Sequence, residues 1–298
     1  MDSNVDYRKL AREELARRKL IHFAEILMHN FEVTEFHSVY YRILDLFISG
    51  DIKKLMITVP PQHGKSQGST RFLPAKMHGI NPDLKISIAS YSATLAKSFN
   101  RDIQRLIDTK EFSALYPETQ INSKRVVNVD GYLRNSEGYE IIGKQGSLKA
   151  VGRGGSLTGN TVDVMIMDDL YKDFAEANSP VIREAAWNWY TTVVKTRLHN
   201  DSQELIVFTR WHEDDIIGRL ESQGLVKEIK CWADLEDLDG RWAKFNFEAI
   251  KESLRTDIDN RDMDDVLYPS KHDLESLEEK RELDPINFGS LYQGDPQP

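Results

Sequence analysis

Short apolar runs alternate with longer segments of helical periodicity along this chain. The apolar runs are rich in Val, Ile, Leu and Met, as is typical of buried parallel strands, and occupy residues 55–59, 86–90, 162–168 and 204–209. Around them the pattern predicts helices at 7–28, 35–48, 66–78, 92–108, 179–198 and 273–283, and one from about residue 214. Strands that alternate with helices predict right-handed crossovers and a doubly wound α/β fold with a mostly parallel sheet.

Local signals refine several of these elements. Ser92 and the Ser179-Pro180 pair are expected to begin helices, because serine caps a helix and proline suits its first turn. Pro74 predicts a kink or stop in the helix at 66–78. Segments 125–129 and 139–151 are predicted to be further strands at an edge of the sheet, with antiparallel pairing as one option.

The run LMITVPPQHGKS at 55–66 places Gly64, Lys65 and Ser66 directly after a strand and before a helix. This order favours a phosphate-binding loop, in which backbone N–H groups and the helix dipole attract the β- and γ-phosphates. Lys65 would neutralise the transferred phosphoryl group, and the Ser66 hydroxyl would hold Mg²⁺. The match is partial, since Val59 stands where the usual motif has its first glycine. Binding of ATP is expected at Pro61, Gln62, His63, Gly64, Lys65 and Ser66.

Two other strands end in residues suited to the same site. Asp168 and Asp169 follow the run at 162–168, so that Asp168 would hold Mg²⁺ and Asp169 would orient the attacking water as a general base. Thr209, at the end of the run at 204–209, could touch the γ-phosphate, because ligands of parallel sheets bind beyond the carboxyl ends of the strands. The alternatives are an Asp-rich turn and an ordinary strand threonine.

Several segments together resemble a known family. PPQHGKS, SIASYSATLAKSFNRDI, VGRGGSLTGNTVDVMIMDDLYKD, WNWYTTVVKTRL and FTRWHEDDIIGRL occur in the order found in the ATPase domain of phage terminase large subunits, from about residue 30 to the end. These subunits are the DNA-packaging motors of tailed double-stranded DNA phages. The resemblance implies an additional-strand P-loop NTPase that uses ATP and Mg²⁺. It also implies a ring, commonly a pentamer, with double-stranded DNA, the portal protein and the small terminase subunit as partners.

The resemblance carries roles over to particular residues. Lys65 and Ser66 match the Walker A residues, Asp168 matches the Walker B carboxylate, and Thr209 matches the coupling motif. Asp169 stands where many relatives have a catalytic glutamate, and its reach is shorter. Thr158 stands where some relatives have an arginine finger, and Arg153 is the nearest substitute, acting in its own subunit or in a neighbour. A DNA contact or a turn cap is the alternative role for Arg153, and Arg197 and Arg210 are reserve candidates.

The acidic residues are concentrated near the C-terminus. The net charge is −9, but residues 232–298 contain 18 Asp and Glu against 8 Lys and Arg, so residues 1–231 contain 30 acids and 31 bases. A nearly neutral body with local basic positions can grip DNA transiently. Lys97, Arg101 and Arg105 share one face of the helix at 92–108 and are candidate DNA contacts, with a solvated helix face as the alternative.

Two further sets of residues have candidate roles. Arg12, Arg17, Arg18 and Lys19 could engage DNA, the portal or a neighbouring subunit, although exposed charge is the default interpretation. His37 and Tyr40 are candidates to touch the adenine, with core packing as the alternative.

Composition and domain organisation complete the prediction. The chain has 298 residues, a single cysteine at 231 and no apolar stretch near the roughly 20 residues needed to span a bilayer, which indicates a reducing cytoplasm, here that of the infected host. Residues 1–231 are expected to form the ATPase domain and 232–298 a small acidic lid or linker subdomain. Relatives continue into a nuclease, and we expect none here. The alternatives are a helicase-like translocase, which needs a second motor domain, and a non-hydrolysing scaffold.

Overall fold

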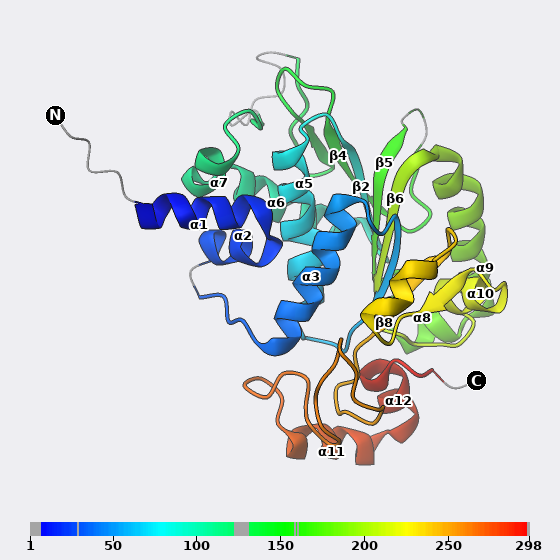
Figure 1. The fold of residues 1–298 in the computed structure, drawn as a ribbon. Helices are drawn as coiled ribbons and strands as arrows, with labels where there is room; N and C mark the ends of the chain where they lie inside the picture. The colour runs from blue at the N-terminus through cyan, green and yellow to red at the C-terminus, as the bar shows by residue number, and fades with distance from the viewer. Residues whose placement is uncertain (1–6, 29, 122–130, 158, 160, 297–298) are drawn as a thin grey trace.

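A central sheet of eight strands organises the computed structural model, which describes residues 7–296 except 29, 122–130, 158 and 160 (Figure 1). The spatial order is β3-β4-β2-β5-β6-β1-β8-β7. The strands are β1 (Lys54–Thr58), β2 (Lys85–Ser90), β3 (Gly138–Glu140), β4 (Ser147–Gly152), β5 (Val162–Asp168), β6 (Leu198–Phe208), β7 (Val226–Glu228) and β8 (Trp242–Asn246). Neighbouring strands are parallel except β3, which pairs antiparallel with β4. The predicted α/β fold with an edge addition is confirmed.

The position of β6 defines the type of sheet. It lies between β1, which leads into the phosphate-binding loop, and β5, which ends at Asp168. The register pairs Thr58 with Phe208 and Asp168 with Val207, so the three strands end at the same level. This arrangement, with an additional strand between the two motif strands, is the one that the family resemblance implied.

Alternate strand residues supply two hydrophobic cores, because successive side chains of a strand point to opposite faces. Val164 and Ile166 of β5 belong to the core on one face, and Met165 and Met167 belong to the core on the other. Burial on both faces explains why these strands are continuous apolar runs.

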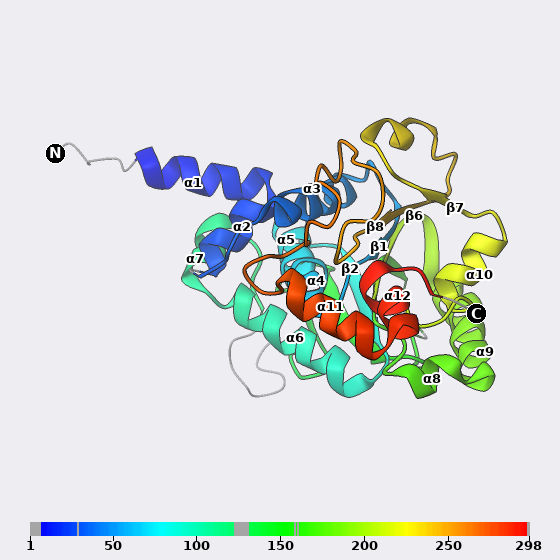
Figure 2. The same cartoon turned by 90° about the horizontal axis from the view of Figure 1, so that it is seen from below.

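Helices cover both faces of the sheet (Figures 1 and 2). One side carries α1 (Tyr7–Arg18), α2 (Leu20–Leu27), α3 (Glu35–Ser49), α4 (Lys65–Gln67), α5 (Leu73–Ile80), α6 (Ala93–Ile107) and α7 (Lys110–Leu115). The other side carries α8 (Phe174–Asn178), α9 (Pro180–Trp189) and α10 (Ile216–Ser222). Ser92 and Ser179 cap α6 and α9 as predicted. Among the described residues, no helix combines the length and apolarity needed to cross a membrane.

Three helices differ from their predictions. The single helix expected at 7–28 is two helices, because Lys19 is extended and the next N–H, that of Leu20, donates to Asp45 at 2.9 Å. The helix after the loop continues past Pro74, which fits because a π-helical turn at Gly68–Phe72 precedes it and places the proline in the first turn of α5. A π-turn and a 3₁₀ turn end the helix after Trp189, and β6 begins at Leu198. The strand expected at 125–129 lies outside the described residues.

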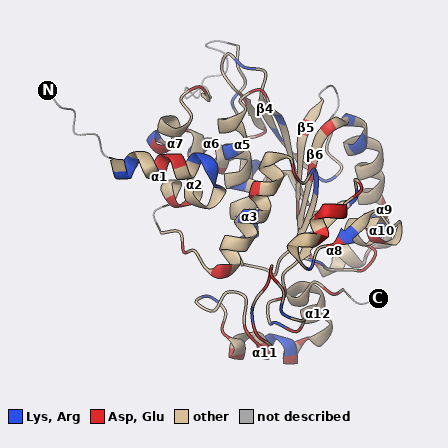
Figure 3. Cartoon of the chain, viewed as in Figure 1, with Lys and Arg blue, Asp and Glu red and all other residues tan. Residues whose placement is uncertain are grey.

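The C-terminal segment, residues 247–296, lies below the carboxyl ends of the strands (Figures 1 and 2). It contains α11 (Leu274–Leu283), which was predicted, and α12 (Pro285–Gln293), which was not. Its small core consists of Ala249, Ile250, Leu277 and Phe288. Strand β8, which precedes this core, belongs to the main sheet beside β1. Acidic positions are frequent along α11 and the loops above it (Figure 3).

Candidate active site

The tips of β1, β5 and β6 bring three of the predicted residues into contact. Lys65 donates from Nζ to Asp169 Oδ2 and to Thr209 Oγ1, each at 2.5 Å. Thr209 also donates its backbone N–H to Asp169 Oδ1 at 2.8 Å. Lys65 and Thr209 are buried, and the Asp169 side chain is 27% exposed. Residues that are 104 and 144 positions apart from Lys65 thus form one polar cluster.

The phosphate-binding loop makes its turn without the missing first glycine. Val59 is buried and continues the strand pairing, because its N–H donates to the Phe208 carbonyl at 3.2 Å. Gln62 and Gly64 have φ values of 63° and 82°, in the left-handed region that makes a tight turn. Tyr40 supports the start of the following helix by donating to the Lys65 carbonyl at 2.7 Å. The loop therefore makes a tight turn even though its sequence matches the usual motif only in part.

Asp168 is a buried carboxylate with one oxygen available. Its Oδ2 accepts a hydrogen bond from Thr70 Oγ1 at 2.6 Å, whereas Oδ1 has no partner among the described residues. Burial, and secondly the charge of Asp169, raise its pKa to about 6, although Lys65, Thr70 and Ser66 act in the opposite direction. Thr70 was not among the residues predicted from the sequence, and its position four residues after Ser66 was the available signal.

Asp169 has an unusual backbone conformation. Its φ is 41°, in the left-handed region that aspartate tolerates better than most residues. Its carbonyl accepts from the Tyr91 N–H at 2.8 Å, and its own N–H donates to the Val207 carbonyl at 3.2 Å. Both neighbouring strands therefore hold the turn that directs this carboxylate toward Lys65. Such backbone outliers are concentrated at functional sites.

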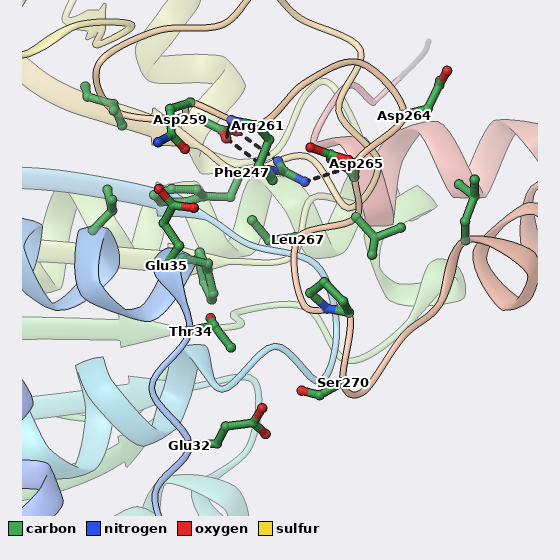
Figure 4. A pocket seen from close by; sticks show the side chains of 17 residues that line it. Glu32, Thr34, Glu35, Phe247, Asp259, Arg261, Asp264, Asp265, Leu267 and Ser270 are labelled. Atoms are coloured by element: carbon green, nitrogen blue, oxygen red, sulfur yellow. Dashed lines mark hydrogen bonds and ion pairs between the residues drawn. The ribbon is translucent and has the colours of Figure 1, made fainter.

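Two cavities are lined in part by the C-terminal segment. The first, of about 490 Å³, is lined by the loop together with Tyr91, Asp169, Thr209, Trp211 and Lys271. The second, of about 740 Å³, lies between the start of α3 and the C-terminal segment (Figure 4). Its walls combine apolar side chains such as Phe36, Phe247 and Leu267 with the carboxylates of Glu32 and Glu35. The same short stretch of chain lines both cavities, because Pro269 and Ser270 line the second and Lys271 lines the first.

His37 lies behind the loop. Its Nδ1 is 2.7 Å from Thr34 Oγ1, and its ring meets that of Tyr268 edge-on at 4.9 Å. A Cβ atom at Gly64 would lie 3.4 Å from His37 Nε2, which shows how closely the ring approaches the loop. Burial lowers the His37 pKa to about 4. His37 is not among the described residues that line either cavity.

The three candidate arginines lie outside the polar cluster. Arg153 donates to the Leu170 carbonyl at 2.5 Å and to Glu176 at 3.0 Å. Arg210 forms a buried ion pair with Asp215, with 2.7 Å between Nε and Oδ2. Arg197 has a buried Nε without a partner among the described residues. Thr158 lies outside the described residues.

The candidate DNA-contacting residues lie on α6. Lys97 pairs with Glu137 at 2.8 Å, and Arg105 pairs with Asp102 at 2.9 Å. Arg101 is exposed on the same helix.

Comparison with known proteins identifies the family. The model of the family described as "Terminase large subunit, T4likevirus-type, N-terminal" matches residues 56–285. The chain belongs to this family. It is the ATPase domain of a terminase large subunit, an ATP-driven motor that packages phage DNA. No curated protein matches the sequence.

Solved structures agree with this terminase fold. The Thermus phage P74-26 large terminase ATPase domain superimposes with a TM-score of 0.57 at 14% identity, over 92% of this chain and 96% of that one. A mutant of the same domain gives a TM-score of 0.56 at 14% identity, over 92% of this chain and 98% of the other. The identities are low, so these two similarities establish the fold alone.

Proposed function

We propose that this terminase domain hydrolyses Mg²⁺-bound ATP at the cluster of Lys65, Asp169 and Thr209. Lys65 stabilises charge on the transferred phosphoryl group, Asp169 accepts a proton from the attacking water, and Thr209 contacts the γ-phosphate. The supporting observation is the convergence of the three side chains within hydrogen-bonding distance at the ends of adjacent parallel strands.

Asp168 and Ser66 would hold the Mg²⁺ ion, which neutralises the phosphates when bound. The Oδ1 atom of Asp168 has no hydrogen-bond partner among the described residues, which supports this assignment, because burial of a carboxylate oxygen without a hydrogen-bond donor or a cation is costly. The hydroxyl of Thr70, which holds the other oxygen, would orient the carboxylate.

The adenine base would occupy the larger cavity beside α3 (Figure 4). Phe36, Phe247 and Leu267 offer apolar contact to a ring, and the carboxylates of Glu32 and Glu35 disfavour a phosphate there. The phosphates would therefore lie in the cavity that contains Lys65. His37 contributes to ATP binding by supporting Gly64 from behind.

Thr209 would report the loss of the γ-phosphate to α10. The next residue, Arg210, is tied to Asp215, and Asp215 caps α10 by accepting from the Gly218 N–H at 2.9 Å. A shift of the β6 tip would thus reach α10 through two consecutive contacts.

The assembled motor would be a ring, commonly a pentamer, on the procapsid portal in the cytoplasm of an infected bacterium. Double-stranded DNA, the portal protein and the small terminase subunit are the proposed partners. Lys97, Arg101 and Arg105 would contact DNA phosphates, and Lys97 and Arg105 would exchange their carboxylate partners to do so. DNA cutting is assigned to none of the residues in this chain.

ATP turnover with and without duplex DNA tests the proposal. We expect Mg²⁺-dependent hydrolysis that falls about 100-fold or more in Lys65→Ala and in Asp169→Ala, because each removes a group that acts in the transition state. Lys144→Ala, which removes a surface ion pair with Glu118, is the control and should retain full activity. Equal rates in wild type and Lys65→Ala would instead support a nucleotide-binding scaffold.

A further inference from the structure

A short stretch of the C-terminal segment, Tyr268–Asp273, lies directly against the phosphate-binding loop. The His272 ring stacks on that of His63, with 4.6 Å between centroids and 20° between planes. Tyr268 contacts His37 behind the loop. Lys271, between these two anchors, donates from Nζ to the Gln62 carbonyl at 2.7 Å. The stretch is thus held on both sides of Lys271, and Asp273 then caps α11.

Lys271 differs from the other cations that line the phosphate cavity. The other three described cations there pair with carboxylates: Lys65 with Asp169 at 2.5 Å, Arg71 with Asp102 at 2.8 Å and Lys172 with Asp173 at 3.6 Å. Within the part of the chain that the structure describes, Lys271 has no carboxylate within ion-pair distance, and it donates instead to the neutral carbonyl of Gln62. Its charge is therefore available to an anionic ligand.

We propose that Lys271 is a further ligand of the nucleotide phosphates, supplied by the C-terminal segment. This inference rests on the proposed function, since it requires ATP in the cavity of Lys65. A hydrogen bond between an ammonium group and a phosphate is stronger than one to a neutral carbonyl, so Lys271 exchanges the Gln62 carbonyl for a phosphate oxygen when the nucleotide binds. The Tyr268–Asp273 stretch then closes on bound nucleotide.

A purely structural role for Lys271 makes a different prediction. If Lys271 only ties the C-terminal segment to the loop, any donor to the Gln62 carbonyl suffices, and Lys271→Gln keeps such a donor without the charge. If Lys271 binds phosphate, the charge is essential, and Lys271→Arg is the substitution that preserves function.

Steady-state hydrolysis of Mg-ATP by the full chain separates these roles. We expect Lys271→Ala and Lys271→Gln to raise KM about tenfold with kcat within about twofold, as for the loss of one charged hydrogen bond formed equally in the ground and transition states. Lys271→Arg should keep KM within about threefold of wild type. Lys280→Ala is the matched control, because Lys280 lies on α11 and donates to the Ser276 carbonyl at 2.8 Å, away from the cavity.

The outcomes distinguish this inference from the function on which it rests. Hydrolysis that depends on Lys65, together with an unchanged KM in Lys271→Gln, would overturn the role of Lys271 alone. A wild-type chain that neither binds nor hydrolyses ATP would overturn the proposed function as well. If Lys271→Ala fails to fold, the Gln and Arg variants still distinguish a charge-dependent role in phosphate binding from a structural attachment to the loop. Melting curves from circular dichroism check the folding of each variant.

Discussion

Asp168 shows at the scale of one residue how a functional requirement opposes stability. A buried carboxylate prefers to be neutral, and its raised pKa of about 6 reflects burial first and the charge of Asp169 second. Metal binding requires the ionised form, however. The protein therefore keeps a group whose useful state is unfavourable in the folded chain without a cation.

Asp168→Asn should abolish Mg²⁺-dependent hydrolysis and stabilise the nucleotide-free protein at pH 8. The folded pKa lies above the ordinary value of 3.8, so protonation favours the folded state, and stability is lost as the pH rises toward and through about 6. The melting temperature of the variant should exceed that of wild type by about 2–4 °C per kcal/mol of relieved penalty. Melting curves measured without nucleotide between pH 4 and pH 8 check this.

The difference in melting temperature should narrow as the pH falls toward 4, where wild-type Asp168 is largely protonated. Asp201→Asn, at an exposed position whose carboxylate pairs with Lys53 on the surface, should match wild type at every pH. A variant Asp168→Asn that melts below wild type at pH 8 would contradict the assignment of an ionisation penalty to this carboxylate.

A buried ion pair links the end of strand β6 to the start of helix α10. It joins Arg210, which follows β6, to Asp215, the N-cap residue of α10. Arg210 and Asp215 are 3% and 2% exposed, and Glu221 approaches the same guanidinium at 3.6 Å. A buried pair adds little net stability, but removal of one partner leaves an uncompensated charge. The contact therefore ties the chain just after β6 to the start of α10.

Arg210→Met should destabilise the fold by about 3–5 kcal/mol, since it leaves the Asp215 carboxylate buried and unpaired. The double variant Arg210→Met with Asp215→Asn should recover much of this loss, because asparagine caps a helix without carrying charge. Urea denaturation of wild type, both single variants and the double variant measures the coupling. A loss of stability in the double variant equal to the sum of the losses in the two single variants would show that the residues do not act as a pair.

The elements around the site were predictable because they combine strong local signals. Buried parallel strands leave continuous apolar runs, and the polar residues after them mark the sheet edge where ligands bind, as at Asp168 and Thr209. The break at Lys19 depends on a hydrogen bond from Leu20 to a distant helix, and no local pattern reports it. Lys271 was missed for the same reason, because its hydrogen bond to Gln62, 209 positions away in the sequence, exists only in the folded chain.

The position of Arg153 in the subunit favours a nucleotide site that is shared between neighbouring subunits of the ring. In its own chain the guanidinium is held by the Leu170 carbonyl and Glu176, and Arg153 is not among the described residues that line the phosphate cavity. The loop lies at the carboxyl end of β4, near the sheet edge occupied by β3. We expect this arginine to serve the nucleotide of a neighbouring subunit in the ring, where an arginine finger stabilises transition-state charge.

Mixed assemblies test whether Arg153 acts between subunits. Arg153→Ala alone should lose about 10³-fold in turnover under conditions where wild-type activity rises with protein concentration. Mixing it with Lys65→Ala should restore measurable activity, because one subunit supplies the arginine and the other an intact loop. Lys65→Ala mixed with Asp169→Ala is the control and should stay inactive, since Lys65 and Asp169 belong to the same site and neither variant subunit retains an intact one. Activity of Arg153→Ala equal to wild type would remove it as the finger.

The ion pair between Lys65 and Asp169 has a consequence for fidelity. In the proposed mechanism, a triphosphate competes with the Asp169 carboxylate for the Lys65 ammonium group, so that ATP binding releases the oxygen that would take a proton from water. Hydrolysis would then depend on correct placement of the γ-phosphate. A nucleotide without a γ-phosphate would leave Asp169 paired with Lys65 and unable to act as the base.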